Sequence, residues 1–302
     1  MTAKHGKAVG FFGGRMLPVK WIPKAVGRRE VGGEAAAVDQ VFVRIEKIGA
    51  MGALIGALEQ LATTSALAND GIFSWSVNQT RFRGIERFPM KYVSKLLDYP
   101  RVIAIPQVRL TAAARMLLGR PGSSERALLL FVLTGTAAGM QVRQCYGYDG
   151  SDNISLITFL VAAIEKAFPG DYQAREACIR FIAFQSCVAY AAAGAVKLVS
   201  PIWRDGSAIT GIFRTSVYGD KGLYRLLCLH PAVPRIVAWS VILGELTFPL
   251  VLVAPKPVAR GILGMGVLFH LANGRFMGLN RFFWAFTATY PAVAHVSRSL
   301  RP

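Results

Sequence analysis

The sequence has few acidic residues and few charges overall. It carries 17 Asp and Glu against 35 Lys and Arg, which gives a formal net charge of +18, and only 17% of its 302 residues are charged. A soluble domain has about a quarter charged residues. Here 53% of residues are hydrophobic, and the mean hydropathy is +0.39. This composition argues against an ordinary soluble domain and indicates a membrane protein.

The excess of basic residues does not indicate a nucleic-acid partner. The basic residues lie between apolar segments, whereas a nucleic-acid surface gathers them in one stripe or patch. Positive flanks on membrane helices, attracted to anionic headgroups, explain this distribution. We therefore expect the lipid bilayer as the partner, and no nucleic acid.

Cysteine and histidine are both scarce. There are four of each, and the sequence contains no CxxC, HxxxH or HExxH motif. This pattern matches neither a disulfide framework nor a zinc site. We expect no metal.

The N-terminus is basic, but no apolar run of signal-peptide length follows its charges. We predict a loosely ordered, basic arm over residues 1–44, a transmembrane domain over 45–297 and a short tail over 298–302. The basic N-terminus is expected on the cytoplasmic side of the cell membrane. We find no internal repeat, which counts against the common repeat-built transporters.

Apolar segments of helical length predict an all-α, polytopic transmembrane bundle with about seven or eight spans. The segments cover roughly 46–67, 101–118, 127–143, 153–168, 178–199, 234–254, 259–277 and 281–297. Segment 101–118 contains Arg109 and Arg115, so it is also compatible with a helix lying in the membrane interface. The basic stretch 69–100 leaves the orientation of the bundle open.

Lys197 is the most unusual residue of segment 178–199. In a helix, Tyr190, Gly194 and Lys197 share one face, and Gly194 would leave a gap beside the lysine stem. Ser200 and Pro201 mark the end of the segment, so the ammonium group could reach the membrane surface. The alternative is a lysine in a partly dry pocket, where it could act as a base.

Glu245 lies in the middle of segment 234–254, too deep for so short a side chain to reach water. Pro249 follows four residues later, so the carbonyl of Glu245 loses its helical donor and the helix should kink there. The carboxyl group is then a protonated packing residue, an ion-pair partner for a buried base, or part of a site.

His270 lies in segment 259–277, on one face with Gly266 and Asn273. A lone histidine on such a face is either a hydrogen-bonded packing residue or part of a site. The sequence alone leaves both possibilities open.

Four stretches carry a resemblance to a known family. They read FQ..VAY..AG..KL....WRDGSA at 184–208, GELTFPLVLV at 244–253, FHLANGRFMGLNRFFWAFTATYPAV at 269–293 and YGYDGSDNISLITFL at 146–160. They resemble the HTTM domain, the membrane domain of vitamin K-dependent γ-carboxylase and its bacterial relatives. The resemblance covers roughly residues 45–297.

The resemblance implies that Lys197 corresponds to the base of vitamin K hydroquinone chemistry, and it points to a quinol-type ligand. The family carries a histidine in an N-H-S stretch that reads Asn153-Ile154-Ser155 here. On this hypothesis the catalytic candidates are Lys197, Glu245 and His270. The ligand-binding candidates are Tyr190, Gly194, Trp203, Asp205 and Asn273.

Three functions remain open. The first is a membrane enzyme that binds a quinol, with carboxylase-like chemistry. The second is a non-catalytic membrane component for maturation or export of a small secreted peptide, as in the relatives that serve a sporulation-delaying toxin. It would work with a peptide substrate or a soluble accessory protein, and Lys197 and Glu245 would pair to hold two helices together. The third is a transporter whose buried Lys, Glu and His relay protons.

Overall fold

The computed structural model describes residues 28–84, 87–144 and 146–300, with side chains from residue 33 onward. In this part of the chain there are thirteen α-helices and four short 3-10 helices, and no strand. The prediction of an all-α fold is confirmed.

Each of the eight apolar segments overlaps one long helix. These helices are α1 (Arg28–Ala62), α4 (Ala104–Leu118), α5 (Ser123–Arg143), α6 (Gly150–Glu165), α7 (Tyr172–Val199), α11 (Ala232–Thr247), α12 (Lys256–Met277) and α13 (Asn280–Ser299). The shorter elements are η1 (Thr64–Leu67), α2 (Trp75–Asn78), η2 (Gln79–Arg81), α3 (Met90–Leu97), η3 (Arg101–Ile103), α8 (Pro201–Arg204), α9 (Ser207–Arg214), α10 (Lys221–Leu229) and η4 (Phe248–Leu252).

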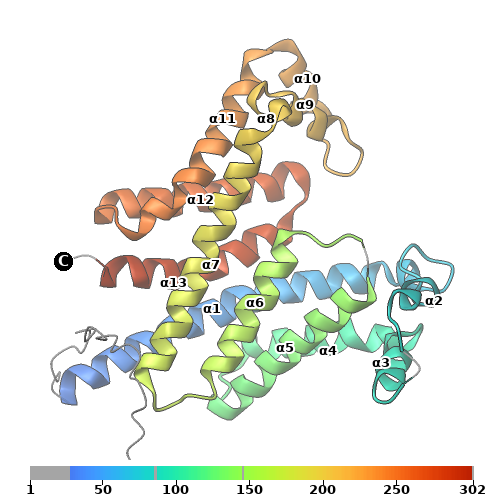
Figure 1. Ribbon diagram of the computed structural model, residues 1–302, viewed down its shortest axis with the longest axis vertical. Helices are drawn as coiled ribbons and strands as arrows, with labels where there is room; N and C mark the ends of the chain where they lie inside the picture. The colour runs from blue at the N-terminus through green and yellow to red at the C-terminus, as the bar shows by residue number, and fades with distance from the viewer. Residues whose placement is uncertain (1–27, 85–86, 145, 301–302) are drawn as a thin grey trace, which may run out of the picture.

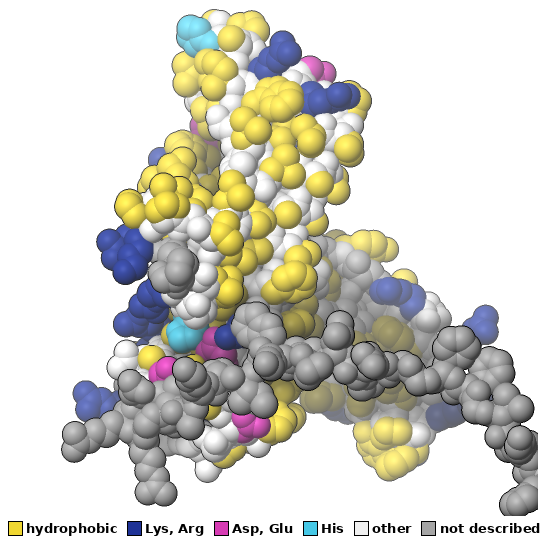
Figure 2. Space-filling view, turned by 60° about the vertical axis from the view of Figure 1, so that its left-hand side comes forward, with side chains coloured by type: hydrophobic (Ala, Val, Ile, Leu, Met, Phe, Trp, Pro, Cys, Tyr) yellow, Lys and Arg dark blue, Asp and Glu magenta, His cyan; other side chains and the backbone are white. Residues whose placement is uncertain are grey.

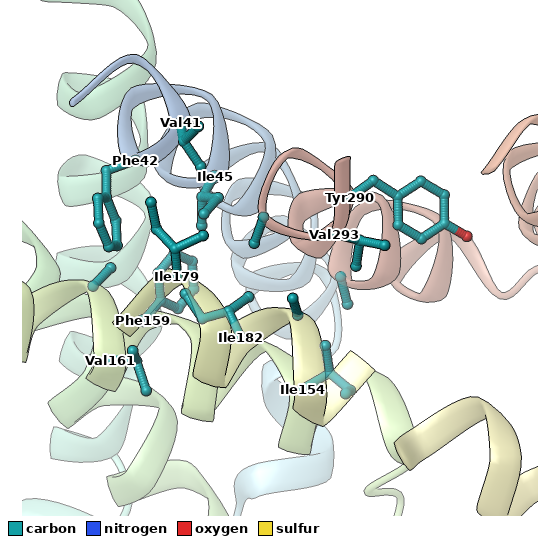
Figure 3. Packing of buried hydrophobic residues seen from close by; sticks show 14 of the residues in the cluster. Val41, Phe42, Ile45, Ile154, Phe159, Val161, Ile179, Ile182, Tyr290 and Val293 are labelled. Carbon is teal, nitrogen blue, oxygen red and sulfur yellow. The ribbon is translucent and has the colours of Figure 1, made fainter. Parts of the chain in front are cut away.

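The long helices form one bundle that α7 crosses (Figure 1). Helices α1, α12 and α13 run roughly across the view, α4 to α6 lie beside α1, and α7 passes obliquely over them to meet α11. The core lies where α1, α6, α7 and α13 come together. Figure 3 shows Phe42 and Ile45 of α1 beside Phe159 of α6, Ile182 of α7 and Val293 of α13, and all five are almost fully buried. Helices α8 to α10 cap the end where α7 and α11 meet.

The predicted boundary at residue 44 is wrong. Helix α1 begins at Arg28, and Val38, Val41 and Phe42 are buried in the main core. These residues recur at helical spacing, so one face of α1 continues its apolar stripe well before residue 44. Residues 28–44 therefore belong to the bundle, and residues 1–27 of the predicted arm lie outside the described part of the chain.

Among the described residues, two helices are long and apolar enough to cross a membrane. They are α7 and the continuous stretch Ala232–Leu252, which joins α11 to η4. In both, only about a third of the most apolar window is buried inside the protein, at 33% and 28%. Their apolar side chains therefore mostly face outward.

A network of charges, most of them buried, joins α1, α5, α6 and α7. Its six members are Asp39, Glu46, Arg126, Glu165, Lys166 and Arg175. The Nε atom of Arg126 lies 2.7 Å from Oε2 of Glu46, and Nζ of Lys166 lies 2.8 Å from Oε2 of Glu165. Three acidic and three basic groups cancel, which is how ionised groups are tolerated away from water. We read this network as structural.

Arg143 organises the basic stretch between α1 and α4. Its guanidinium is fully buried and donates to the backbone carbonyls of Leu67, Phe73 and Leu97. These carbonyls come from three separate turns of residues 64–103, so one side chain ties the whole stretch together. The 69–100 region is accordingly folded, with Trp75 buried at its centre.

Gly194 lets α7 and α11 approach each other. A Cβ atom at this position would lie 2.9 Å from the backbone nitrogen of Leu246 and 3.1 Å from Cβ of Glu245. The sequence predicted a gap beside the lysine stem. The space is instead filled by the backbone of α11, because a small residue in a membrane helix permits close helix contact.

We predict that Gly194→Ala lowers the free energy of unfolding by about 1–3 kcal/mol, because the added methyl group pushes α11 away. Gly244→Ala on α11 is the matched control, since a Cβ atom there meets nothing within 4 Å. The control should be neutral or stabilising by up to about 1 kcal/mol. Thermal unfolding of the purified protein in detergent measures both. Equal stability of the two variants would contradict the close contact.

Candidate functional site

A cavity of about 710 Å³ lies between α7, α11 and α12. Helices α8, α9 and α10 contribute residues to it, and so does the start of α6. Most of its wall is apolar, formed by side chains such as Ala193, Ile209, Val237, Val241, Phe269 and Phe276. Its volume falls within the range of about 300–1,000 Å³ that small-molecule sites usually have.

Lys197 and Glu245 form an ion pair in the wall of this cavity. Nζ of Lys197 lies 2.9 Å from Oε1 and 2.7 Å from Oε2 of Glu245. The lysine side chain is 19% exposed and the glutamate side chain 8%. The ammonium group therefore points to the carboxylate and does not extend away from the helix end into the surroundings. Because both side chains line the cavity, a ligand there would meet the pair.

The turn after α7 places an aromatic ring against the lysine. Ser200 ends α7, and Pro201 begins the short helix α8, which contains Trp203. Nζ of Lys197 lies 5.2 Å from the centre of the Trp203 ring, within the range of a cation–π contact. The ammonium group is thus held by a carboxylate and by an aromatic face.

Pro249 determines the backbone geometry next to Glu245, the acidic partner of the pair. The α-helical part of α11 ends at Thr247, and the chain continues as the 3-10 helix η4. The N–H of Phe248 donates to the carbonyl of Glu245, which replaces the helical bond that Pro249 cannot make. The predicted break in the helix is present just after Glu245.

His270 belongs to a chain of hydrogen bonds that crosses three helices. Nε2 of His270 lies 2.5 Å from the hydroxyl of Tyr190, and that hydroxyl lies 2.6 Å from the hydroxyl of Tyr290. The imidazole stacks on Phe286 at a centroid distance of 4.5 Å. Its Nδ1 atom is buried and has no hydrogen-bond partner among the described residues. His270 lines the cavity, whereas its Nδ1 atom is enclosed by the protein itself.

Sequence reasoning missed Tyr290. It lies on α13, 100 residues from Tyr190, and no spacing rule links the two. One feature of the sequence could have indicated Tyr290. The otherwise apolar segment 281–297 contains three hydroxyl side chains close together, which are Thr287, Thr289 and Tyr290. Gly266 makes room for this hydroxyl, because a Cβ atom there would collide with it.

The remaining candidates divide into two groups. Asn273 and Trp203 line the cavity together with Lys197, Glu245, Tyr190 and His270. Gly194 and Asp205 do not. Gly194 is buried against α11, and Oδ1 of Asp205 accepts the backbone N–H of Ser207 at 2.8 Å at the start of α9. This hydrogen bond lowers the pKa of Asp205, which is consistent with a structural cap on the protein surface.

A second cavity of about 690 Å³ lies between α11 and α12. Five residues line both cavities and form the wall between them, which are Tyr190, Val237, Val241, Glu245 and Phe269. The outer residues of the second cavity include Met265, which is 66% exposed. Glu245 therefore borders both the first cavity and a groove that reaches the outer apolar surface.

No protein-family model, curated protein or solved structure matches this chain. Within the described residues, no cluster of three or more His, Cys, Asp or Glu side chains could hold a metal ion. The chemistry of the site must therefore be argued from its own side chains.

The site combines an ion pair that can exchange a proton, Lys197 and Glu245, with a mostly apolar cavity wall. Over hydrogen bonds of 2.7 and 2.9 Å, Lys197 and Glu245 can pass a proton between them without moving. A bound apolar molecule would displace water from this cavity, which would strengthen the polar contacts made inside. Such a cavity can bind an apolar molecule and hold one polar group of it next to the pair.

We predict that Lys197→Met destabilises the protein by about 3–5 kcal/mol, because Glu245 is left buried without its partner. The double variant Lys197→Met/Glu245→Gln should regain most of this loss, since neither charge remains. Chemical or thermal unfolding of the purified proteins measures the cycle. The control is Lys91→Met, which changes an exposed lysine of α3. A Lys197→Met protein as stable as the control would mean that the pair contributes nothing.

Proposed function

We propose that this chain is a multi-pass integral membrane protein that binds a lipid-soluble, quinol-type ligand between α7, α11 and α12. The first support is the outer surface of these helices. Phe184 and Val196 of α7, Ile236 of α11 and Met265 of α12 are all more than 60% exposed. Figure 2 shows hydrophobic side chains over much of the visible face. Large exposed apolar surfaces need a partner, and lipid is the partner that fits a helical bundle.

The observation that carries the proposal is the placement of the Lys197–Glu245 pair inside an apolar cavity of about 710 Å³. An ion pair that only holds two helices together does not require a cavity beside it. A binding site for an apolar molecule with one reactive hydroxyl does, because the molecule needs both an apolar wall and a polar group at one point of that wall.

The residues present fit a quinol. The rings of Phe269, Phe276 and Phe286 offer aromatic surface to a flat ring. The amide of Asn273 offers hydrogen bonds to its oxygens. A quinol supplies an acidic hydroxyl and a readily oxidised ring when it is bound.

Lys197 would be the base. In the ion pair its amine is protonated, so it must first pass a proton to Glu245, which touches it through both oxygens. The neutral amine can then accept a proton at Nζ from the ligand side. Trp203 limits the movement of the amine meanwhile, because the ring lies 5.2 Å from Nζ.

The proposal agrees with the resemblance to the HTTM family at Lys197 and departs from it at α6. The residue in the place of the family's histidine is Ile154, and both Asn153 and Ile154 line the cavity. The wall is thus apolar where the carboxylases have an imidazole. This difference favours quinol-linked chemistry, or ligand binding alone, over glutamate carboxylation.

The second candidate is a non-catalytic membrane component that assists maturation or export of a small peptide. One observation favours it: both oxygens of Glu245 contact Lys197, and such a contact holds α7 and α11 in register without any reaction. On this view the cavity holds lipid chains or an apolar peptide segment.

We predict that quinone co-purifies with the wild-type protein and is at least about tenfold depleted in Ala193→Phe, because the new ring fills the cavity. Ala193 lines the cavity, whereas Ala195 of the same helix is exposed on its outer side. Ala195→Phe is therefore the matched control and should retain the quinone. Mass spectrometry of lipid extracts from equal amounts of detergent-purified protein measures all three.

The alternative outcomes are informative. If all three proteins fold and none retains a quinone, the proposed ligand is wrong and the non-catalytic candidate gains. If wild type and both variants retain quinone equally, it is adsorbed from the membrane and does not occupy this cavity.

A further inference from the structure

A second charged site is lined by residues other than those of the Lys197–Glu245 cavity. A cavity of about 280 Å³ is lined by four basic side chains from three helices, which are Arg44 of α1, Lys256 and Arg260 of α12 and Arg298 of α13. No acidic residue lines it, and none of the four basic residues forms an ion pair within the described chain. The buried network of α1, α5, α6 and α7 is neutral by contrast.

The placement of these charges is unfavourable for the protein alone. Lys256 and Arg260 are one turn apart in the first turns of α12, so two like charges face each other. The start of a helix is also its positive end, where basic residues are disfavoured and anions are stabilised. Four cations and a helix start together create a strongly positive site that an anion would relieve.

The floor and the rim of this cavity are apolar. Ala259, Leu263 and Ala294 line it beside the charges. Val253 and Val258, the apolar residues on either side of Lys256, are 69% and 52% exposed. Figure 2 shows Lys and Arg side chains on the side of the molecule where α12 begins, next to hydrophobic ones. Basic side chains next to exposed apolar ones can bind a lipid that has an anionic headgroup and apolar acyl chains.

We infer that this cavity binds a phosphate group, and that an anionic phospholipid supplies it. Arginine and lysine are the side chains that bind phosphate oxygens best, and basic pockets between membrane helices hold anionic headgroups. The volume leaves ample room, since a water molecule in the liquid takes about 30 Å³. The exposed valines would contact the acyl chains, which favours a lipid over a free phosphate ion. This inference is independent of the proposed ligand cavity.

The test is a lipid titration followed by native mass spectrometry of the full-length protein in detergent. The probes are phosphatidylglycerol, phosphatidylcholine and inorganic phosphate. The variant is Lys256→Gln/Arg260→Gln. The matched control is Lys91→Gln/Lys95→Gln, which removes another pair of exposed lysines one turn apart, on α3.

We predict preferential binding of phosphatidylglycerol over phosphatidylcholine by the wild-type protein. Each basic residue near a headgroup contributes about fivefold in affinity, so the Lys256→Gln/Arg260→Gln protein should bind phosphatidylglycerol about twenty- to thirtyfold more weakly. The control should change affinity by less than about twofold. Because the changed residues are exposed, we expect both proteins to fold, and unfolding temperatures check this.

Two other results have clear meanings. Binding of inorganic phosphate that displaces the lipid, and that is lost in the same variant, would support the phosphate site and identify a free ion as its source. Equal phosphatidylglycerol binding by the wild-type protein, the variant and the control would overturn the inference.

Discussion

The bundle depends on the burial of one ammonium group and one carboxylate in apolar surroundings. Lys197 and Glu245 lie on different helices, and either charge alone would be costly there. Their contact therefore fixes the register of α7 against α11. Gly194 permits the approach, the 3-10 turn at Pro249 takes up the carbonyl of Glu245, and α8 brings Trp203 against the amine. One interaction thus shapes the cavity that surrounds it.

The cost of burying an unpaired charge also helps to distinguish the other charged groups of the protein. The network around Glu46 and Glu165 cancels its own charge, so we read it as stabilising the bundle. The Lys197–Glu245 pair cancels too, but it borders two cavities. The basic group around Arg260 does not cancel at all. We propose that these three arrangements serve packing, ligand binding and the binding of an outside anion, in that order.

Local features of the sequence predicted the helices and the unusual polar residues. Length and low charge located the eight segments, and the cost of burying ionisable groups drew attention to Lys197, Glu245 and His270. The sequence did not predict contacts between residues that are far apart along the chain. Tyr290 becomes visible only when α13 packs against α7, and Gly194 only when α11 fills its gap. The start of α1 was misplaced because a basic, glycine-containing stretch resembles a loose arm, although its apolar stripe already runs into the core.

The most direct test is an experimental structure of the protein in nanodiscs made from its native membrane. We expect lipid around α7, α11 and α12, an intact Lys197–Glu245 contact, and density for a flat molecule in the cavity within hydrogen-bond distance of this pair. A Lys197 side chain extended to the headgroups, with Glu245 unpaired and the cavity collapsed, would contradict it.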